Sequence, residues 1–435
     1  MRRHSAQGGR RAVASCRSIH WLVTLAMASS VRGRAFTLLE SLVGRASGIA
    51  SRNISHSLNG STTRGSEAWN SAAPTLTPKT SGRVRGCCRR LSSAGRPLRQ
   101  VQQPGRQISA PAPPHPAALA EDDLRHLFDD IQKELESQFD LQRIAKYYFD
   151  GQGKAVRPLI TVLMSRAINT HLHDDDRLLD SQREVAKVAE MIHTASLVHD
   201  DILDASDTRR GKPSVNYLYG QRKAVMAGDF ILSVAYTLTA RKCNADVVLA
   251  LAQIPKDLIH GEFLQLGAKE SEDERFAHYL KKTFLKTASL MAHSCKAVAI
   301  MSGADEELQE VAFQYGRNVG IAFQLVDDLL DFVSSSSTMG KPTAADLKLG
   351  LATAPVLFAA GKFPELNPMI MRRFQEPGDV QKAFELVHQS DGLEQTQFLA
   401  RQHCQEAIKV ISTLKPSDEQ KALVTITDKV LNRIK

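Results

Sequence analysis

Apolar side chains recur at helical spacing after residue 118, and this pattern limits the fold more than any other feature of the chain. Three runs show it: Leu124, Leu127, Ile131, Leu135 and Phe139; Val185, Val188, Ile192 and Ser196; Phe276, Leu280 and Phe284. An apolar residue every three or four positions forms one face of an α-helix, whereas a half-buried strand alternates at every second position. No sustained alternation accompanies these runs. We therefore predict an all-α fold.

One long segment, residues 311–332, is apolar around much of its circumference, which predicts a buried helix. Gly316 and Gly320 lie inside it, and a glycine within a helix costs about 1 kcal/mol relative to alanine. We expect both glycines to allow close packing of another helix. Glycine and proline clusters separate the runs, and no internal repeat is present. The pattern predicts a single large helical domain over residues 118–435.

The first quarter of the chain has a different composition. Residues 1–120 hold 18 basic and 2 acidic residues, whereas the remainder holds 38 basic and 45 acidic residues. An Arg- and Ser-rich, acid-poor segment is typical of a mitochondrial transit peptide and has too few apolar residues to fold. A Pro/Ala/Gln-rich linker follows at 100–118. We predict that residues 1–117 are a transit peptide and disordered linker, and that the protein resides in the mitochondrial matrix.

The apolar run at 19–31 leaves a secretory signal as the alternative, although arginines continue far beyond it. The run is too short to span a membrane. Cys243, Cys295 and Cys404 of the helical region have no metal-ligand or disulfide spacing, which suits a reducing compartment. Because the basic excess is confined to the N-terminal quarter, it does not indicate binding of nucleic acid.

Two aspartate clusters carry the strongest chemical signal. They are Asp200, Asp201 and Asp204, and Asp327, Asp328 and Asp331, each at the end of an apolar helical segment. Residues four apart share one helix face, so like charges crowd together there and destabilise the helix. A bound cation would neutralise them. Carboxylate oxygens with few nitrogen or sulfur neighbours favour Mg²⁺, which often shares its coordination shell with substrate phosphates.

A third acidic stretch, from Asp174 to Asp180, has no apolar helix leading into it. Like any single cluster of this kind, it is better explained as solvated surface. We assign it to a loop.

Basic residues next to glycine accompany both clusters. Lys154 and Arg157 lie in GQGKAVRP, Arg209 and Arg210 in RRGKP, and Lys341 in GKP. Arginine offers forked donors to phosphate oxygens, and neighbouring glycines let the backbone approach an anion. Two acidic clusters with several basic anchors predict a site for more than one diphosphate.

These segments occur in the order seen in one enzyme family. GQGKAVRP, MIHTASLVHDDILD, TRRGKPSVN, GEFLQL, KTASL, GIAFQLVDDLLDF and GKPTAADLKLG resemble the motifs of the trans-isoprenyl (polyprenyl) diphosphate synthases. Within the family the chain is most similar to the catalytic subunits of animal long-chain (decaprenyl and solanesyl) enzymes, which make the ubiquinone side chain. The resemblance covers residues 121–435. It implies an isoprenoid-synthase helical domain and a prenyltransferase that adds isopentenyl diphosphate to an allylic diphosphate.

The resemblance also implies roles for individual residues. Mg²⁺ would be held by Asp200, Asp204 and Asp327, with support from Asp201, Asp328 and Asp331. Isopentenyl diphosphate would be bound by Lys154, Arg157, His193 and Arg210. The allylic diphosphate (farnesyl or geranylgeranyl) and the developing cation would face Arg209, Lys286, Thr287, Gln324 and Lys341. Among these, Asp200, Asp204, Asp327, Lys286 and Gln324 are the expected catalytic residues.

A long product is expected from the helix that carries Asp200. Ser196 is one helical turn before Asp200, and Ala195 is beside it, and both are small. In short-chain members of the family, large aromatic residues close the pocket at this level. The alternative is that both residues are merely tight packing positions.

The resemblance further implies a homodimer core or a heteromer with a related second subunit, and peripheral contact with a membrane when the product leaves. Three other functions are less consistent with the sequence. A geranylgeranyl diphosphate synthase would make a shorter product, and a non-catalytic partner subunit would be expected to lack intact aspartate clusters. A terpene cyclase would lack the second cluster and the arginine doublet.

Overall fold

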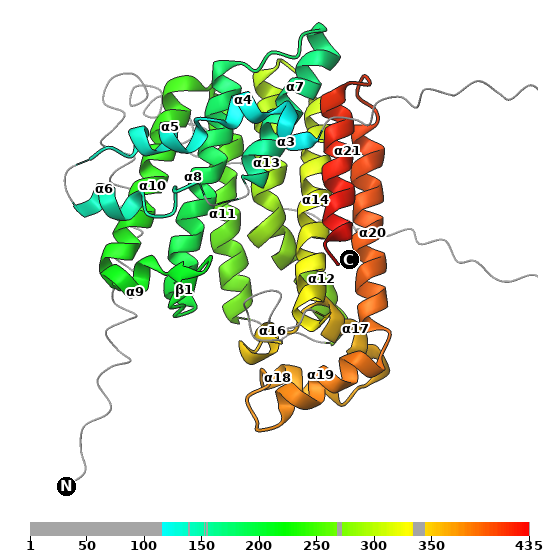
Figure 1. The fold of residues 1–435 in the computed structure, drawn as a ribbon. Coiled ribbons are helices and arrows are strands. Elements are labelled where there is room, and N and C mark those ends of the chain that lie inside the picture. Colours follow the sequence, from blue (N-terminus) through cyan, green and yellow to red (C-terminus); the bar gives the residue numbers. More distant parts are fainter. Residues whose placement is uncertain are drawn as a thin grey trace, which may run out of the picture. The chain divides into compact units, whose positions relative to one another are not determined.

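The computed structural model describes residues 115–137, 140–151, 153, 155–267, 272–333 and 344–434. Within these ranges it is almost entirely helical, as predicted (Figure 1). Residues 1–114 of the predicted transit peptide and linker lie outside the described residues, as do Phe139, Lys154 and Lys341. Residues 115–117, which the sequence assigned to the linker, are described, and Pro116 begins the helix α3 (Pro116–Leu119).

Long helices form the body of the fold. They are α7 (Val156–His173), α8 (Asp180–Leu203), α10 (Gln221–Lys242), α11 (Ala245–Gly267), α12 (Glu272–Thr283), α13 (Ser289–Met301), α14 (Glu306–Val333), α20 (Gly392–Ile411) and α21 (Asp418–Leu431). Shorter elements connect or cover them: α3 (Pro116–Leu119), α4 (Glu121–Leu124), α5 (Leu127–Glu134), α6 (Asp140–Ala145), α9 (Val215–Tyr219), α16 (Ala345–Lys348), α17 (Ala354–Lys362), α18 (Leu366–Met371) and α19 (Asp379–Gln389). A π-helical turn, η1 (Phe284–Ala288), joins α12 to α13, and a 3₁₀ turn, η2 (Asn432–Ile434), follows α21.

The segment 311–332 is indeed a buried helix. It forms most of α14, which packs against α13 on one side and α20 on another (Figure 1). A Cβ atom at Gly316 would lie 2.6 Å from the carbonyl oxygen of Met291, and one at Gly320 would lie 2.5 Å from Cα of Ala288. The two glycines therefore allow α14 to touch the backbone of α13 and η1, as the sequence predicts.

The first amphipathic run is divided between α4 and α5 rather than forming one helix, although Leu127, Ile131 and Leu135 are fully buried. Two distant arginines explain part of this difference. Arg166 donates to the carbonyl oxygen of Leu119, and Arg183 donates to that of Asp123. These carbonyl groups are bonded to side chains, so the segment is held in short turns against α7 and α8.

The only strands in the described ranges are β1 (Thr208–Arg209) and β2 (Lys212–Pro213), which form a small antiparallel hairpin after α8. In Figure 1 this hairpin lies at the lower end of the bundle, where α8, α11 and α14 also end. The acidic stretch is a loop from Asp174 to Leu179, as predicted, whereas Asp180, assigned to the same loop, is the first residue of α8. The C-terminal ends of these helices therefore bring the two aspartate clusters to the same end of the bundle.

None of the helices described in the structure is both long and apolar enough to cross a membrane.

Candidate active site

The first aspartate cluster lies at the C-terminal end of α8. Asp200 is in the last turn, and Asp204 is the residue that caps the helix, its N–H donating to the carbonyl oxygen of Asp200. Burial raises the pKa of Asp200 to about 6; Lys286 opposes this shift, and the carboxylates of Asp204 and Glu262 add to it. Burial also raises the pKa of Asp204. Because a helix C-terminus is itself partly negative, this group of carboxylates attracts a cation.

Lys286 is a cation whose charge lowers the pKa of both Asp200 and Asp204, against the effect of burial. Its Nζ atom lies 2.6 Å from Oε2 of Glu262 and 3.0 Å from Oε1 of Gln265. Both partners come from α11 and belong to the GEFLQL motif, whose residues had no predicted role in the site. Lys286 is part of the π-turn η1, and such turns are frequent at functional sites.

Thr287, the next residue of η1, points to a different helix. Its hydroxyl donates to Oε1 of Gln324 on α14 at 2.8 Å. Consecutive residues of one turn thus link the first aspartate cluster, through Lys286, to the helix that carries the second. The structure brings together three of the residues predicted to face the allylic substrate.

The second cluster occupies the last two turns of α14, and its three carboxylates have different surroundings. Oδ1 of Asp327 lies 2.8 Å from Nη1 of Arg433. Asp328 is 1% exposed and accepts hydrogen bonds from Tyr279 and Gln324. Asp331 accepts the backbone N–H groups of the first two residues of α16, at 3.0 and 3.1 Å, and so caps that helix.

Asp201 resembles Asp328 in its surroundings. It is fully buried, accepts a hydrogen bond from the Tyr148 hydroxyl at 2.9 Å, and forms an ion pair with Arg209 at 2.6 Å. Hydrogen bonds within the protein therefore engage the carboxylates of Asp201, Asp328 and Asp331. Their predicted support of a metal ion stays a prediction. Tyr148 and Tyr279 escaped the sequence analysis because they lie 53 and 49 residues from their partners.

A separate basic region surrounds His193, two turns before Asp200 on α8. Burial, together with the charges of Arg157, Arg210 and, more weakly, Arg209, holds the pKa of His193 well below its usual value. These surroundings favour the neutral form of the imidazole. Nε of Arg157 is buried and has no hydrogen-bond partner among the described residues. A buried donor without a partner is unfavourable and indicates a site for an acceptor such as a phosphate oxygen.

Glu190, which is 3% exposed, lies in the same region and also escaped the sequence analysis. Burial raises its pKa, and the nearby Arg157 and Arg210 lower it. Its negative charge and, more weakly, that of Asp327 act on the guanidinium of Arg157.

The hairpin explains how neighbouring arginines reach two different regions. Arg209 pairs with Lys212 in the strand register, so Arg210 and Gly211 form the two-residue turn. Both have positive φ angles, 52° and 76°. This combination is typical of the type I′ hairpin turn, and it is unfavourable for a residue with a side chain. Arg209 bonds to Asp201, whereas the guanidinium of Arg210 lies against Gly153, near Arg157 and His193.

The carboxylates fit a divalent metal that is shared with a substrate. No three His, Cys, Asp or Glu side chains in the described ranges lie close enough to hold a metal alone. Mg²⁺, however, usually takes only one or two carboxylates and completes its shell with water and substrate phosphates. Asp200 and Asp204 are candidates for such a pair of oxygen ligands.

The two predicted chain-length positions differ in exposure. Ala195 is fully buried in the main core, and Ser196 is half-buried, with its hydroxyl donating to the carbonyl oxygen of His193. The burial of Ala195 agrees with a packing role. The effect of either residue on product length stays a prediction.

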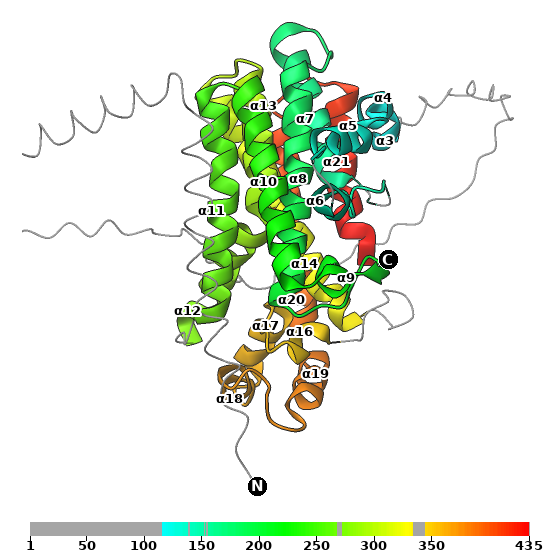
Figure 2. The same ribbon diagram turned by 90° about the vertical axis from the view of Figure 1, so that its left-hand side faces the viewer.

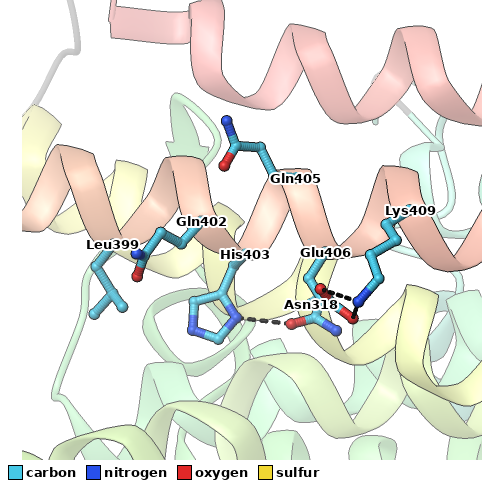
Figure 3. A pocket seen from close by; sticks show the side chains of 7 residues that line it. All are labelled: Asn318, Leu399, Gln402, His403, Gln405, Glu406 and Lys409. Atoms are coloured by element: carbon cyan, nitrogen blue, oxygen red, sulfur yellow. Dashed lines mark hydrogen bonds and ion pairs between the residues drawn. The ribbon is translucent and has the colours of Figure 1, made fainter. Parts of the chain in front are cut away.

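A surface pocket elsewhere on the protein has different chemistry. It is lined by Asn318, Leu399, Gln402, His403, Gln405, Glu406 and Lys409, and its polar groups largely bond to one another (Figure 3). Nδ1 of His403 lies 2.8 Å from Oδ1 of Asn318, and Lys409 pairs with Glu406. This lining has neither a pair of carboxylates nor an arginine, so it offers no counterpart to the site above.

Several known proteins are similar to this chain in sequence and fold. Residues 139–387 match the polyprenyl synthetase family. The chain is 57% identical to human all trans-polyprenyl-diphosphate synthase PDSS1, over 74% of this chain and 77% of that protein. It is 42% identical to decaprenyl-diphosphate synthase subunit 1 of Schizosaccharomyces pombe, over 73% of this chain and 91% of that protein. It is 40% identical to a rice protein, solanesyl-diphosphate synthase 1, mitochondrial, over 68% of this chain and 73% of that protein.

Among solved structures, the polyprenyl synthase of Caulobacter crescentus, complexed with calcium and isoprenyl diphosphate, is similar with a TM-score of 0.66 and 31% identity. The similarity covers 74% of this chain and 97% of that one. Members of the family thus bind a divalent metal together with the diphosphate. The sequence matches, the helical fold and the paired aspartate clusters agree, and the chain is a prenyltransferase of the polyprenyl synthetase family.

Proposed function

We propose that this enzyme is a magnesium-dependent long-chain all-trans-polyprenyl diphosphate synthase that makes the precursor of the ubiquinone side chain. The observation that carries the proposal is the division of the site into two charged regions. One holds the carboxylates of Asp200 and Asp204, and the other holds Arg157, Arg210 and the neutral His193. Two regions of opposite charge suit two diphosphates, one bound through a metal and one bound directly.

In the reaction the allylic diphosphate loses its diphosphate group, the double bond of isopentenyl diphosphate attacks the resulting allylic cation, and a proton is released. Mg²⁺ held by Asp200 and Asp204, with Asp327, would neutralise charge on the departing diphosphate. Arg209 and Lys286 add fixed positive charge near that group. The oxygens of Thr287 and Gln324 face the developing cation, and preorganised dipoles of this kind lower the barrier.

Isopentenyl diphosphate binds in the basic region. The unpartnered Nε of Arg157 and the guanidinium of Arg210 donate to phosphate oxygens. His193 adds a donor without adding charge, because its pKa is depressed. Lys154 and Lys341 are proposed as further phosphate ligands from their motifs.

The preceding segment is proposed to direct the enzyme to the mitochondrial matrix. The net charge of residues 1–120 and the mitochondrial names of relatives such as the rice protein support this proposal. Domain bounds of 1–117 for the targeting segment and linker, and 118–435 for the catalytic domain, are proposed with it. Sequencing the N-terminus of protein recovered from mitochondria tests both, since retention of Met1 would contradict them.

A related second subunit is proposed to bind the face formed by α10 and α11, which lie side by side (Figure 2). Leu249, Ile259 and Phe263 of α11 are 69, 57 and 71% exposed, and Met226 of α10 is 63% exposed. An exposed apolar stripe of this kind marks an interaction surface. A relative named as subunit 1 of its synthase supports a partner of the same family.

The test is incubation of the purified chain with farnesyl and isopentenyl diphosphates and Mg²⁺, with and without the candidate partner, followed by analysis of product length. Long all-trans products are expected. A geranylgeranyl product would indicate the shorter-chain alternative. No product under either condition would indicate a non-catalytic subunit.

A further inference from the structure

We propose that the second aspartate of each cluster is a positioning residue. These residues are Asp201, held in place by Tyr148, and Asp328, held in place by Tyr279. The inference rests on the proposed function, because it assigns a task within that site. It separates the carboxylates into two kinds: Asp200, Asp204 and Asp327 take part in metal binding, whereas Asp201 and Asp328 orient side chains that meet the substrates.

The first pair shows the arrangement. Oδ2 of Asp201 accepts the Tyr148 hydroxyl at 2.9 Å, and Oδ1 accepts Nε and Nη2 of Arg209 at 2.8 and 2.6 Å. The Tyr148 hydroxyl in turn accepts the backbone N–H of Val215 at 3.2 Å. The Tyr148 hydroxyl therefore both donates and accepts a hydrogen bond, and this fixes the plane of the Asp201 carboxylate. An ionised carboxylate in this orientation sets the direction of the Arg209 guanidinium.

The second pair repeats the pattern with different residues. Oδ2 of Asp328 accepts the Tyr279 hydroxyl at 2.5 Å, and Oδ1 accepts Nε2 of Gln324 at 2.8 Å. With its NH₂ group committed to Asp328, Gln324 presents Oε1 to the Thr287 hydroxyl, 2.8 Å away. The Thr287 proton is thereby directed to Gln324, which leaves oxygen lone pairs of Thr287 for a cation.

Burial makes these hydrogen bonds consequential. Asp201 and Asp328 are 0 and 1% exposed, and Tyr148 and Tyr279 are 2 and 3% exposed. A buried carboxylate that loses a donor cannot recover it from water, so the remaining partner must shift. In both clusters that remaining partner is a side chain that is predicted to face the allylic substrate.

The experiment compares Tyr148→Phe and Tyr279→Phe with Tyr315→Phe. Tyr315 is a fully buried tyrosine whose hydroxyl donates to the carbonyl oxygen of Leu423 at 2.9 Å, away from both aspartates. All three variants lose a buried hydroxyl and keep the ring, so the control accounts for loss of stability. The full-length chain is used, together with its partner subunit if activity requires one.

The two tyrosines should have separate effects. Tyr148→Phe should raise KM for the allylic diphosphate about tenfold with little change in kcat, because Arg209 loses its fixed direction. Tyr279→Phe should lower kcat about tenfold with little change in KM, because Thr287 and Gln324 lose theirs. Tyr315→Phe should change neither constant. The inference is overturned if the first two variants match the control, or if their effects are not divided in this way.

Binding measurements separate this inference from the proposed function, because they need no turnover. Calorimetric titration with inorganic pyrophosphate in the presence of Mg²⁺ should show weaker binding for Tyr148→Phe and unchanged binding for Tyr279→Phe. Titration with Mg²⁺ alone should give the wild-type midpoint, the Mg²⁺ concentration at half-saturation, for both variants. A midpoint shifted as far as that of Asp200→Ala would make the second aspartates metal ligands and overturn the inference, even in a chain that forms no product.

Discussion

Arg433, near the C-terminus of the chain, forms an ion pair with Asp327, the first aspartate of the second cluster. Nη1 of Arg433 lies 2.8 Å from Oδ1 of Asp327, and its guanidinium carbon lies 4.4 Å from the centre of the Phe323 ring. The side chains of Arg433 and Asp327 are 35 and 36% exposed. A residue of the final 3₁₀ turn thus supplies positive charge at a carboxylate that is predicted to bind metal.

Arg433→Gln should lower the Mg²⁺ concentration at half-saturation, measured without substrate, about two- to fivefold. Asp327 then loses a cation that competes with the metal, and a partly exposed ion pair contributes about 1 kcal/mol or less. The measurement is calorimetric titration, with Lys421→Gln as control, since Lys421 pairs with Asp418 of its own helix. A higher midpoint in Arg433→Gln would mean that the arginine assists metal binding rather than competing with it.

Asp200→Ala and Asp327→Ala should each reduce turnover at least 1,000-fold while preserving the helical circular dichroism spectrum. Loss of metal-stabilised charge on the leaving group removes several kcal/mol, and each ~1.4 kcal/mol is a factor of ten in rate. Asp175→Ala, in the acidic loop that resembles a third cluster, is the matched control and should retain activity. Near-normal turnover in either site variant would refute its assignment.

Ser196→Phe should shorten the main product by several isoprene units without abolishing condensation. Ser196 is half-buried one turn before Asp200, and a phenyl ring at this position would obstruct a product chain that runs along this face of α8. Ala195→Tyr is expected to act in the same direction, but Ala195 is fully buried, so the larger side chain should also cost stability. Leu197→Phe, about 100° around the helix, is the control. Unchanged long products from Ser196→Phe would place the product channel elsewhere.

Replacing the apolar stripe of α11 should prevent subunit association. Phe263→Glu and Leu249→Glu place a charge where 71 and 69% exposed apolar side chains now lie, and a charge is costly to bury in an interface. Size-exclusion chromatography with light scattering should show loss of the oligomer. Phe398→Glu, on α20 and 56% exposed, should leave it intact. Assembly that tolerates both changes on α11 would exclude this face as the interface.

Stability should fall as the pH drops from about 6.5 to about 4, in part because of His403. Burial, with a smaller effect of Arg317, lowers the pKa of His403 to about 4. Between these values the unfolded chain binds a proton that the folded chain excludes, so stability rises with pH. His403→Gln should flatten this part of the urea-unfolding profile. The exposed His126, replaced in the same way, should leave it unchanged, and an equal effect of both would contradict the assignment.

The sequence predicts those parts of the fold and site that depend on local spacing. The apolar periodicity of α8 and α14 is helical, and aspartates four positions apart must share a face, so the two clusters and their helices follow from short-range rules. The loop at Asp174 is predicted for the same reason, because no apolar run leads into it.

The rest depends on contacts between distant segments. Nothing near Tyr148 or Tyr279 in the sequence indicates that their hydroxyls bond to aspartates about 50 residues later. Arg433 is likewise recognisable only once α21 packs beside α14. The breaks between α3, α4 and α5 have a related origin, since Arg166 and Arg183 bond to the backbone carbonyl groups of Leu119 and Asp123 from other helices.

The hairpin between β1 and β2 connects the two charged regions of the site through consecutive residues. Arg209 and Arg210 are consecutive, yet one bonds to Asp201 and the other lies in the basic region beside Gly153. A single peptide unit joins the two residues, so a displacement of the turn moves both side chains. If the two diphosphates bind as proposed, we expect binding of one to change the affinity for the other, and by linkage the effect would be equal in both directions. Adjacency in the covalent chain would then couple the two half-sites.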